Sequence, residues 1–167
     1  MIKRLFVLFV ICFICSGLFC QENAIYHNLD NSYSIQYPNT WELEEDQENG
    51  TITIYKNNQN SLIHTHLQIS SALWEDGSLE EFVKAINLED MKDLYSDFAI
   101  IEHNQEQYKC MYEVSYLLNE VKANSILYFL KIEDQIFIFL AMAQDDENYE
   151  LDKEVFINII ESIEFQN

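Results

Sequence analysis

The sequence has little of the residues that most often interrupt or cross-link a small fold. Only three glycines, one proline and four cysteines occur among 167 residues. So few glycines exclude a glycine-rich phosphate-binding loop. Three of the cysteines lie within the first 20 residues, so only Cys110 remains beyond them. One cysteine cannot build a disulfide framework, and the domain must be stabilised by its core.

Basic residues are also scarce. Residues 21–167 contain seven lysines and no arginine against 29 acidic residues, so their formal net charge is −22. A nucleic-acid partner needs a basic patch that neutralises phosphates, and this composition excludes one. The acidity either serves solubility or attracts a basic partner, and the sequence leaves both interpretations open.

The first 20 residues differ from the rest of the chain. Lys3 and Arg4 precede an apolar run that ends at small residues, which is typical of a signal peptide. The run is shorter than the roughly 20 residues that span a bilayer, so a transmembrane helix is the less favoured alternative. We predict export, with residues 1–20 as the signal peptide. Residues 21–167 are long enough for one domain and too short for two.

Acylation of Cys20 would determine whether the exported protein is attached to a membrane. Bacterial lipoproteins carry a leucine and two mostly small residues before the cysteine that is acylated. Here Leu18 lies one place too near Cys20, and Phe19 replaces a small residue. A lipid anchor at Cys20 and plain secretion both stay open. We expect membrane contact only through that anchor, and a periplasmic, envelope-anchored or secreted location.

The only proline, Pro38, lies between two predicted short strands. Residues 33–37 form the first, because the residue before a proline favours extended geometry. Pro38 fits the second position of a four-residue turn over 37–40. The second strand begins at Trp41, which we place in the core. A third strand follows at 51–56, where isoleucines alternate toward one side.

Further strands are predicted from the alternation of apolar residues. In the first of them, Ile63, Leu67 and Ile69 are expected to share one face. Alternate residues from Tyr108 to Tyr116 also share a face. The last strand is apolar on both faces, which is typical of the middle of a covered sheet. These strands cover residues 61–71, 97–105, 107–118, 124–132 and 136–143.

Two segments have helical spacing instead. Ser78 and Glu81 form a capping box at the start of a predicted helix within 77–95. An apolar stripe within 147–165 predicts a closing helix. Antiparallel strands with one helix inside the chain and another at its end predict an α+β fold.

Two motifs resemble a known superfamily. The segment YSIQYPNTWEL, residues 33–43, resembles the opening motif of PsbP-like domains, which include the extrinsic photosystem II protein and the bacterial DcrB lipoproteins. The segment EVFINIIESIEF, residues 154–165, is similar to their last helix. The resemblance covers most of 24–166. It implies an antiparallel sheet flanked by helices in a three-layer α/β/α sandwich.

The resemblance also implies a class of function. PsbP-like proteins are mostly accessory, assembly or binding proteins at membranes, and the residues behind the metal and chloride effects of the plant members have no match here. The bacterial relatives are exported and often lipid-anchored. We therefore predict a non-enzymatic, monomeric envelope protein that has no cofactor and binds a protein partner.

A metal-dependent enzyme is the alternative. His64 and His66 lie two apart, and on one strand face they would be roughly 7 Å apart. Both could then bind one zinc ion, with His27, His103 or a carboxylate as a third ligand. Two histidines on a solvated strand face are the favoured interpretation.

Two other segments contain candidate sites. Cys110 alternates with tyrosines on a predicted core face, and a buried inert thiol is favoured over a nucleophile. Asp46, Glu48 and Gly50 resemble part of a calcium loop. However, the glycine is one place early and Asn57 stands where the closing glutamate belongs, so the segment is not an EF-hand.

Overall fold

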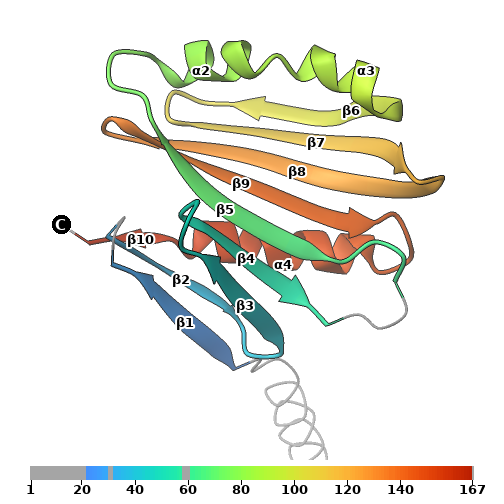
Figure 1. Cartoon of the computed structure of the whole chain (residues 1–167), viewed down its shortest axis with the longest axis horizontal. Coiled ribbons are helices and arrows are strands. Elements are labelled where there is room, and N and C mark those ends of the chain that lie inside the picture. Colours follow the sequence, from blue (N-terminus) through green and yellow to red (C-terminus); the bar gives the residue numbers. More distant parts are fainter. Residues whose placement is uncertain (1–21, 30–31, 58–60, 167) are drawn as a thin grey trace, which may run out of the picture.

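The computed structural model describes residues 22–29, 32–57 and 61–166 (Figure 1). The signal peptide and Cys20 lie outside these residues. The N-terminal strands are β1 (Asn23–Asn28), β2 (Tyr33–Pro38), β3 (Trp41–Asp46), β4 (Thr51–Lys56) and β5 (His66–Leu73). They are followed by helix α2 (Leu79–Ile86), the 3-10 helix η1 (Leu88–Asp90) and helix α3 (Met91–Leu94). The C-terminal elements are β6 (Ser96–Gln105), β7 (Lys109–Leu118), β8 (Val121–Ile132), β9 (Gln135–Gln144), α4 (Tyr149–Glu161) and β10 (Glu164–Phe165).

The described strands form two antiparallel sheets. The larger sheet has seven strands in the order β3-β4-β5-β9-β8-β7-β6, and the smaller has the order β1-β2-β10. Strand β9 lies in the middle of the larger sheet, between β5 and β8. This position confirms the prediction for the strand that is apolar on both faces.

The core consists of two hydrophobic clusters on opposite faces of the large sheet. On one face, Phe156 and Ile160 of α4 pack with Phe137 and Phe139 of β9. The other cluster contains apolar residues of α2 and the side chains of β9 that point the opposite way, including Ile136. Figure 1 shows α4 behind the sheet, with α2 and α3 along its β6 edge.

The predicted α+β class with an antiparallel sheet is confirmed. The three-layer α/β/α sandwich is not confirmed, because α2 and α3 lie along one edge of the sheet and do not cover the whole of their face (Figure 1). Helix α4 therefore covers one face of the large sheet, while α2 and α3 leave part of the other face uncovered.

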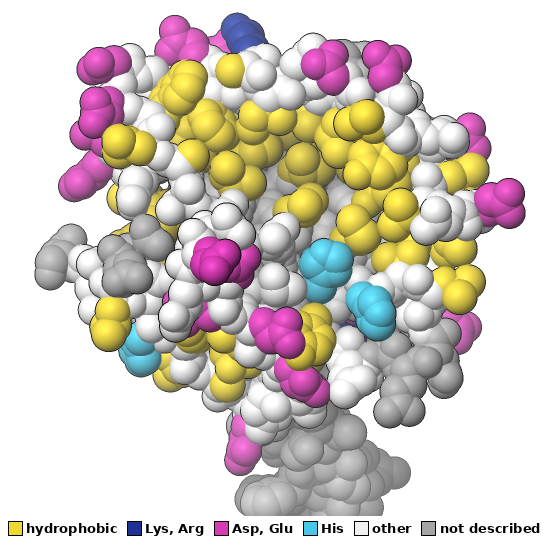
Figure 2. All heavy atoms as spheres, in the orientation of Figure 1, with side chains coloured by type: hydrophobic (Ala, Val, Ile, Leu, Met, Phe, Trp, Pro, Cys, Tyr) yellow, Lys and Arg dark blue, Asp and Glu magenta, His cyan; other side chains and the backbone are white. Residues whose placement is uncertain are grey.

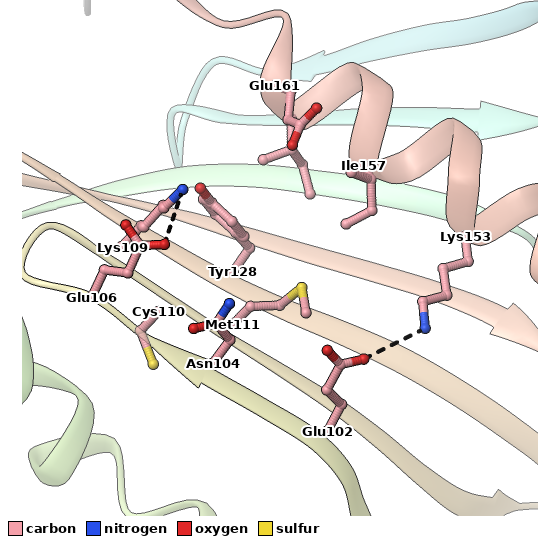
Figure 3. Close-up of a pocket in the computed structure, with 11 residues that line it drawn as sticks. Glu102, Asn104, Glu106, Lys109, Cys110, Met111, Tyr128, Lys153, Ile157 and Glu161 are labelled. Carbon is pink, nitrogen blue, oxygen red and sulfur yellow. Dashed lines mark ion pairs between the residues drawn. The ribbon is translucent and has the colours of Figure 1, made fainter.

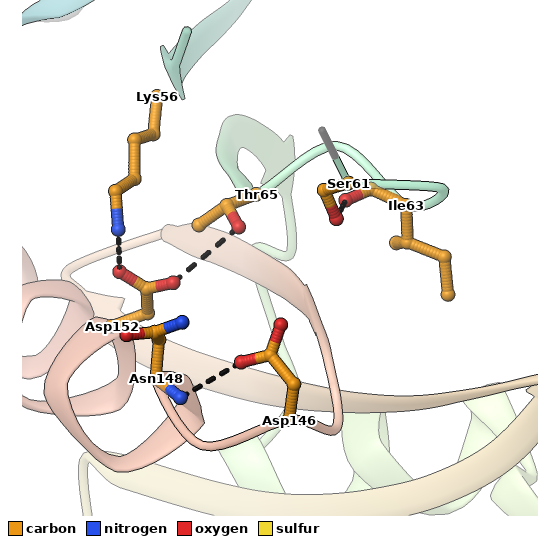
Figure 4. Close-up of polar contacts among 7 residues, drawn as sticks. All are labelled: Lys56, Ser61, Ile63, Thr65, Asp146, Asn148 and Asp152. Atoms are coloured by element: carbon orange, nitrogen blue, oxygen red, sulfur yellow. Dashed lines mark hydrogen bonds and ion pairs between the residues drawn. The ribbon is translucent and has the colours of Figure 1, made fainter. Parts of the chain in front are cut away.

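A buried acid fixes α4 to the sheet beside it (Figure 4). Oδ1 of Asp152 lies 2.7 Å from the ammonium group of Lys56 in β4. The hydroxyl of Thr65 donates a hydrogen bond of 3.4 Å to Oδ2 of the same carboxylate. Asp152 is buried, so its carboxylate loses hydration. The ion pair with Lys56 and the hydrogen bond from Thr65 offset that loss.

The corner around the proline differs slightly from the prediction. Pro38 is the last residue of β2, and the turn occupies the next two residues. The reason is that β1, which the sequence analysis did not predict, pairs with β2 as far as Pro38. Trp41 is nevertheless buried, with 6% of its surface exposed, as predicted. Its ring meets Phe156 edge-on with the centroids 5.7 Å apart.

The helix after β5 begins as predicted and ends earlier. The hydroxyl of Ser78 accepts from the backbone N–H of Glu81 (3.2 Å), whose carboxylate accepts from the backbone N–H of Ser78 (2.7 Å). Asn87 adopts a left-handed φ of 48° and ends α2. Asparagine tolerates this conformation better than most residues, and the chain continues as η1 and α3.

Candidate functional site

A partly exposed apolar surface of the large sheet lies on the side opposite α4. We call it the open face and define it by the residues aligned in register with Leu140 and Met142 of β9. Paired residues of antiparallel strands point to the same side of a sheet. One row runs from β3 to β7 as Glu44, Thr53, Gln68, Leu140, Leu127 and Tyr112. The adjacent row is Glu42, Tyr55, His66, Met142, Ser125 and Val114. Leu127, Ser125 and Val114 are buried, so the continuous accessible part of both rows extends from β3 to β9.

The middle of the open face is apolar and partly accessible. Ile138, Leu140 and Met142 of β9 are each half-buried and pack against the cluster beneath α2. Figure 2 views the molecule from this side and shows hydrophobic side chains gathered over the sheet below the two short helices. A contiguous apolar surface of this kind marks an interaction site more often than scattered single residues do.

Aromatic rings form the boundary between the open face and α2. The ring of Phe82 lies edge-on to Trp74 (centroids 5.3 Å apart) and to Phe129 of β8 (6.1 Å). Gly77 is needed for this packing, because a Cβ at that position would lie 1.9 Å from Nε1 of Trp74. Leu73, beside Trp74, is exposed.

Acidic side chains occupy the β3 margin of the open face. The hydroxyl of Tyr55 lies 3.0 Å from Oε2 of Glu42 and 3.1 Å from Oε1 of Glu44. Hydrogen bonding to these carboxylates raises the pKa of Tyr55 to about 12. Asn57 donates a further hydrogen bond of 3.1 Å to Glu42. The two carboxylates are therefore held in place beside the apolar residues.

Acidic side chains also lie at one end of the open face, where β5 ends and the chain turns toward α2. Glu75 and Asp76 are exposed in the loop before α2, next to Trp74, and line a shallow depression together with Glu81. In Figure 2, Asp and Glu side chains lie around much of the periphery of the visible face. Acidic side chains thus border the apolar middle along its β3 side and at one end of the strands.

A cleft of about 330 Å³ between α4 and strands β6 to β8 is a second candidate (Figure 3). Its two lysines have acidic partners: Lys109 lies 3.3 Å from Glu106, and Lys153 lies 3.9 Å from Glu102. Both lysines of the cleft are therefore paired with carboxylates of its own walls. The paired lysines make this cleft a poor site for a charged ligand. We therefore favour the open face, as a site for a protein segment.

A buried network next to this cleft was not predicted from the sequence. Glu113 of β7 was expected on the side opposite the core residues, yet only 3% of its surface is exposed. It accepts hydrogen bonds from the hydroxyl of Tyr149 (2.7 Å) and from the ammonium group of Lys153. Burial raises the pKa of Tyr149, and the hydrogen bond to Glu113 raises it further. The network joins α4 to β7.

The two histidines of the zinc hypothesis do not lie on one strand face. Strand β5 begins at His66, and His64 precedes it as an exposed residue. Nδ1 of His66 donates a hydrogen bond of 2.8 Å to the carbonyl oxygen of His64. Ile63 does not share a face with Leu67 either, because it packs in the cluster beneath α2. The chain bends between residues 62 and 65, and the predicted alternation breaks there.

A metal site is not evident in the part of the chain that the structure describes. Within those residues, no three His, Cys, Asp or Glu side chains gather closely enough to hold a metal ion. Asp46, the first residue of the calcium candidate, accepts hydrogen bonds from the backbone N–H groups of Glu48 (3.0 Å) and Asn49 (3.3 Å) and from the Asn49 side chain (2.7 Å). These hydrogen bonds lower the pKa of Asp46. Asp46 closes the turn from β3 to β4.

Cys110 is buried, as predicted, with 1% of its surface exposed. Its sulfur lies 3.7 Å from Nε2 of His103 on the neighbouring strand, a contact that sequence spacing did not suggest. The imidazole also stacks on Tyr112, with the centroids 4.2 Å apart. Burial raises the pKa of the Cys110 thiol, which opposes formation of a nucleophilic thiolate.

None of the helices among the described residues is long and apolar enough to cross a membrane. No family model matches the sequence, and no curated protein is significantly similar to it.

Solved structures do match the fold. Cyanobacterial PsbP (CyanoP) from Synechocystis sp. PCC 6803 superposes with a TM-score of 0.61 at 12% identity, over 90% of this chain and 96% of its own. The Ran-binding protein Mog1p of Saccharomyces cerevisiae gives 0.62 at 7% identity, over 87% and 96%. LpqN of Mycobacterium tuberculosis, involved in cell envelope biogenesis, gives 0.60 at 14% identity, over 87% and 91%. At these identities the likeness concerns the fold alone.

Proposed function

From the PsbP-like fold that this chain has, we propose that it is a non-enzymatic binding module of the cell envelope, which docks a protein partner on its open face. The single observation that carries the proposal is the half-buried apolar band of β9 on the side of the sheet away from α4. A partner on this band would complete the third layer of the predicted α/β/α sandwich. Burial of such a surface is the main driving force of most protein association.

The ionisable groups in and beside the Figure 3 cleft support a binding role over catalysis. Glu113 is held by Tyr149 and Lys153, and the thiol of Cys110 is buried with its pKa raised. A general base or nucleophile needs a pKa matched to its task and a route to substrate. These groups serve packing and helix attachment instead.

The structural neighbours support the same class of function by analogy. Mog1p is a Ran-binding protein, and LpqN is involved in cell envelope biogenesis. By analogy, these neighbours support a protein partner and a location in the cell envelope for this chain. They assign it no reaction.

Export and anchoring are part of the proposal. Residues 1–20 would direct the chain out of the cytoplasm, and Cys20 would carry the lipid if an anchor is present. Incorporation of a fatty-acid analogue into the wild type, and its loss in Cys20→Ser, would support the anchor. A wild type that is exported without label would leave plain secretion, and a wild type retained in the cytoplasm would contradict the proposed location.

Site-specific photo-crosslinking in intact cells tests the docking face. A photoreactive amino acid replaces Gln68 or Leu140 on the open face, and Leu151 or Glu154 on α4 as controls. Leu151 is exposed on the other side of the molecule. We expect one protein to be crosslinked from both open-face positions and from neither control. Crosslinks from α4 alone, or from no position, would overturn the proposal.

A further inference from the structure

We propose that the occupant of the open face is a cationic amphipathic helix, with lysine or arginine beside its apolar stripe. This inference rests on the proposed function and adds the chemistry of the partner. It comes from the order of side chains across the sheet, which strand register fixes.

Polarity changes stepwise along one row of the open face. The row begins with Glu44 at the β3 margin, continues through Thr53 and Gln68, and becomes apolar at Leu140 and Leu127. The adjacent row changes in the same way, from a glutamate through a tyrosine and a histidine to a methionine. Neither row contains a lysine, so the carboxylates of this face have no basic partner within the rows.

A second acidic group lies at one end of the apolar band. Glu75 and Asp76 follow Trp74, where β5 ends beside the start of β9. Lysines of α2 and β8 already have partners. Lys84 lies 2.5 Å from Glu80, and Lys131 donates a hydrogen bond to the carbonyl oxygen of Trp74 (3.0 Å). A ligand on the apolar band therefore meets negative charge along its β3 side and at this end.

The dimensions fit one helix. Strands β3 and β9 are three steps apart in the sheet, which is about 14 Å at the usual strand spacing. A helix with its side chains is about 10 to 12 Å across. A helix that lies on β9 and β5 therefore brings long basic side chains on its flank to Glu42 and Glu44. Such side chains place their stems on apolar surface and their charges at its rim.

The net charge opposes two other occupants. A second copy of this chain would bring the same acidic side chains to the interface, and residues 21–167 carry a net charge of −22. Like charges facing each other across an interface weaken association. An anionic lipid surface is disfavoured for the same reason.

A pair of synthetic peptides tests the inference on the purified exported protein. Each has about 18 residues, or roughly 27 Å of helix, with leucine at helical spacing. The polar positions are lysine in one peptide and glutamate in the other. We expect the lysine peptide to bind, and binding to weaken as salt rises from about 0.05 to 0.5 M because salt screens exposed charges. The glutamate peptide should not bind. Equal binding of both peptides, or binding unaffected by salt, would overturn the inference.

Matched charge variants separate a docking face from general attraction to an acidic protein. Glu42→Gln with Glu44→Gln should weaken binding of the lysine peptide about tenfold, through two ion pairs of the usual strength. Glu150→Gln with Glu154→Gln removes the same charge from exposed positions of α4 and should leave the affinity within about twofold. Equal effects of the two double variants would mean non-specific attraction and would contradict the proposed site.

The crosslinked protein distinguishes this inference from the proposed function. If the segment captured from Gln68 and Leu140 is apolar with flanking basic residues, both proposals are supported. If it is uncharged or acidic, the partner chemistry is wrong while the docking face stands. If no crosslink forms on the open face, the docking face itself is wrong.

Discussion

The hydroxyl of Tyr149 lies 2.7 Å from Oε1 of Glu113 and donates a hydrogen bond from the first turn of α4 to the middle of β7. Lys153 donates to the other carboxylate oxygen. Glu113→Ala should lower the free energy of unfolding by about 2 to 4 kcal/mol, because it leaves Lys153 and Tyr149 without their shared partner. Tyr149→Phe should cost about 1 to 3 kcal/mol. Urea unfolding measures both, and wild-type stability of Glu113→Ala would show that the network contributes nothing.

Trp41 should be among the most sensitive positions of the core. Its indole is buried against Phe156 of α4, so Trp41→Ala should cost about 3 to 5 kcal/mol. Such a loss would unfold many single domains. Tyr108→Ala is the control, because Tyr108 is exposed and its loss should stay within about 0.5 kcal/mol. Similar unfolding midpoints for the two variants would mean that the tryptophan does not support the core.

The capping box of α2 should make stability depend on pH. Hydrogen bonds from the backbone N–H and then the hydroxyl of Ser78 lower the pKa of Glu81 below its ordinary value of 4.5. The ionised carboxylate is the stabilising form. Its contribution is therefore present above the unfolded-state pKa and is lost as pH falls through the lower, folded-state pKa.

Glu81→Gln tests this dependence. The variant should melt below the wild type at pH 7, and the difference should shrink as pH falls through the lowered pKa of Glu81, where the carboxyl becomes protonated. In a Ser78→Ala background the pH dependence of the difference should diminish, because the donor hydroxyl is gone and the cap is weakened. A difference in melting temperature that is constant with pH would contradict the assigned hydrogen bonds.

Zinc should have no specific effect on stability. His64 and His66 contact each other through a backbone carbonyl and are not aligned on one strand face. We expect zinc to leave the melting temperature of the wild type unchanged, and His64→Gln with His66→Gln to change stability by less than about 1 kcal/mol. A zinc-dependent rise in melting temperature that disappears in the double variant would reinstate the metal-binding alternative.

Local sequence signals predicted the parts of the fold that local chemistry determines. The Ser78 and Glu81 pair marked the start of α2, and apolar residues on both sides of β9 marked the central strand. The bend at residues 62–65 was missed because apolar alternation continues through it in the sequence. The end of α2 at Asn87 was missed because the helical spacing continues beyond it.

Long-range pairing explains what the sequence did not predict. In the alternating pattern of β7, Glu113 falls on the side that the sequence predicts to face solvent. It is buried because Tyr149 and Lys153 of α4 pack against it, and these residues are far away in the sequence. The open face depends on the register of strands far apart in the chain. The alignment of Glu44 with Leu140, three strands away, follows from three strand pairings that no single segment encodes. The excess of acidic residues left a basic partner open without placing it on any face of the fold.

The most direct test of the account is whether a change confined to the open face releases the partner from a folded protein. Gln68→Arg places bulk and positive charge between the acidic margin and the apolar band, and Leu151→Arg makes a similar change on α4. With the partner identified by crosslinking, its binding to each purified variant is measured by titration. We predict that Gln68→Arg weakens binding at least about tenfold at an unchanged melting temperature, while Leu151→Arg binds like the wild type. Wild-type affinity of Gln68→Arg would contradict the open face as the docking site.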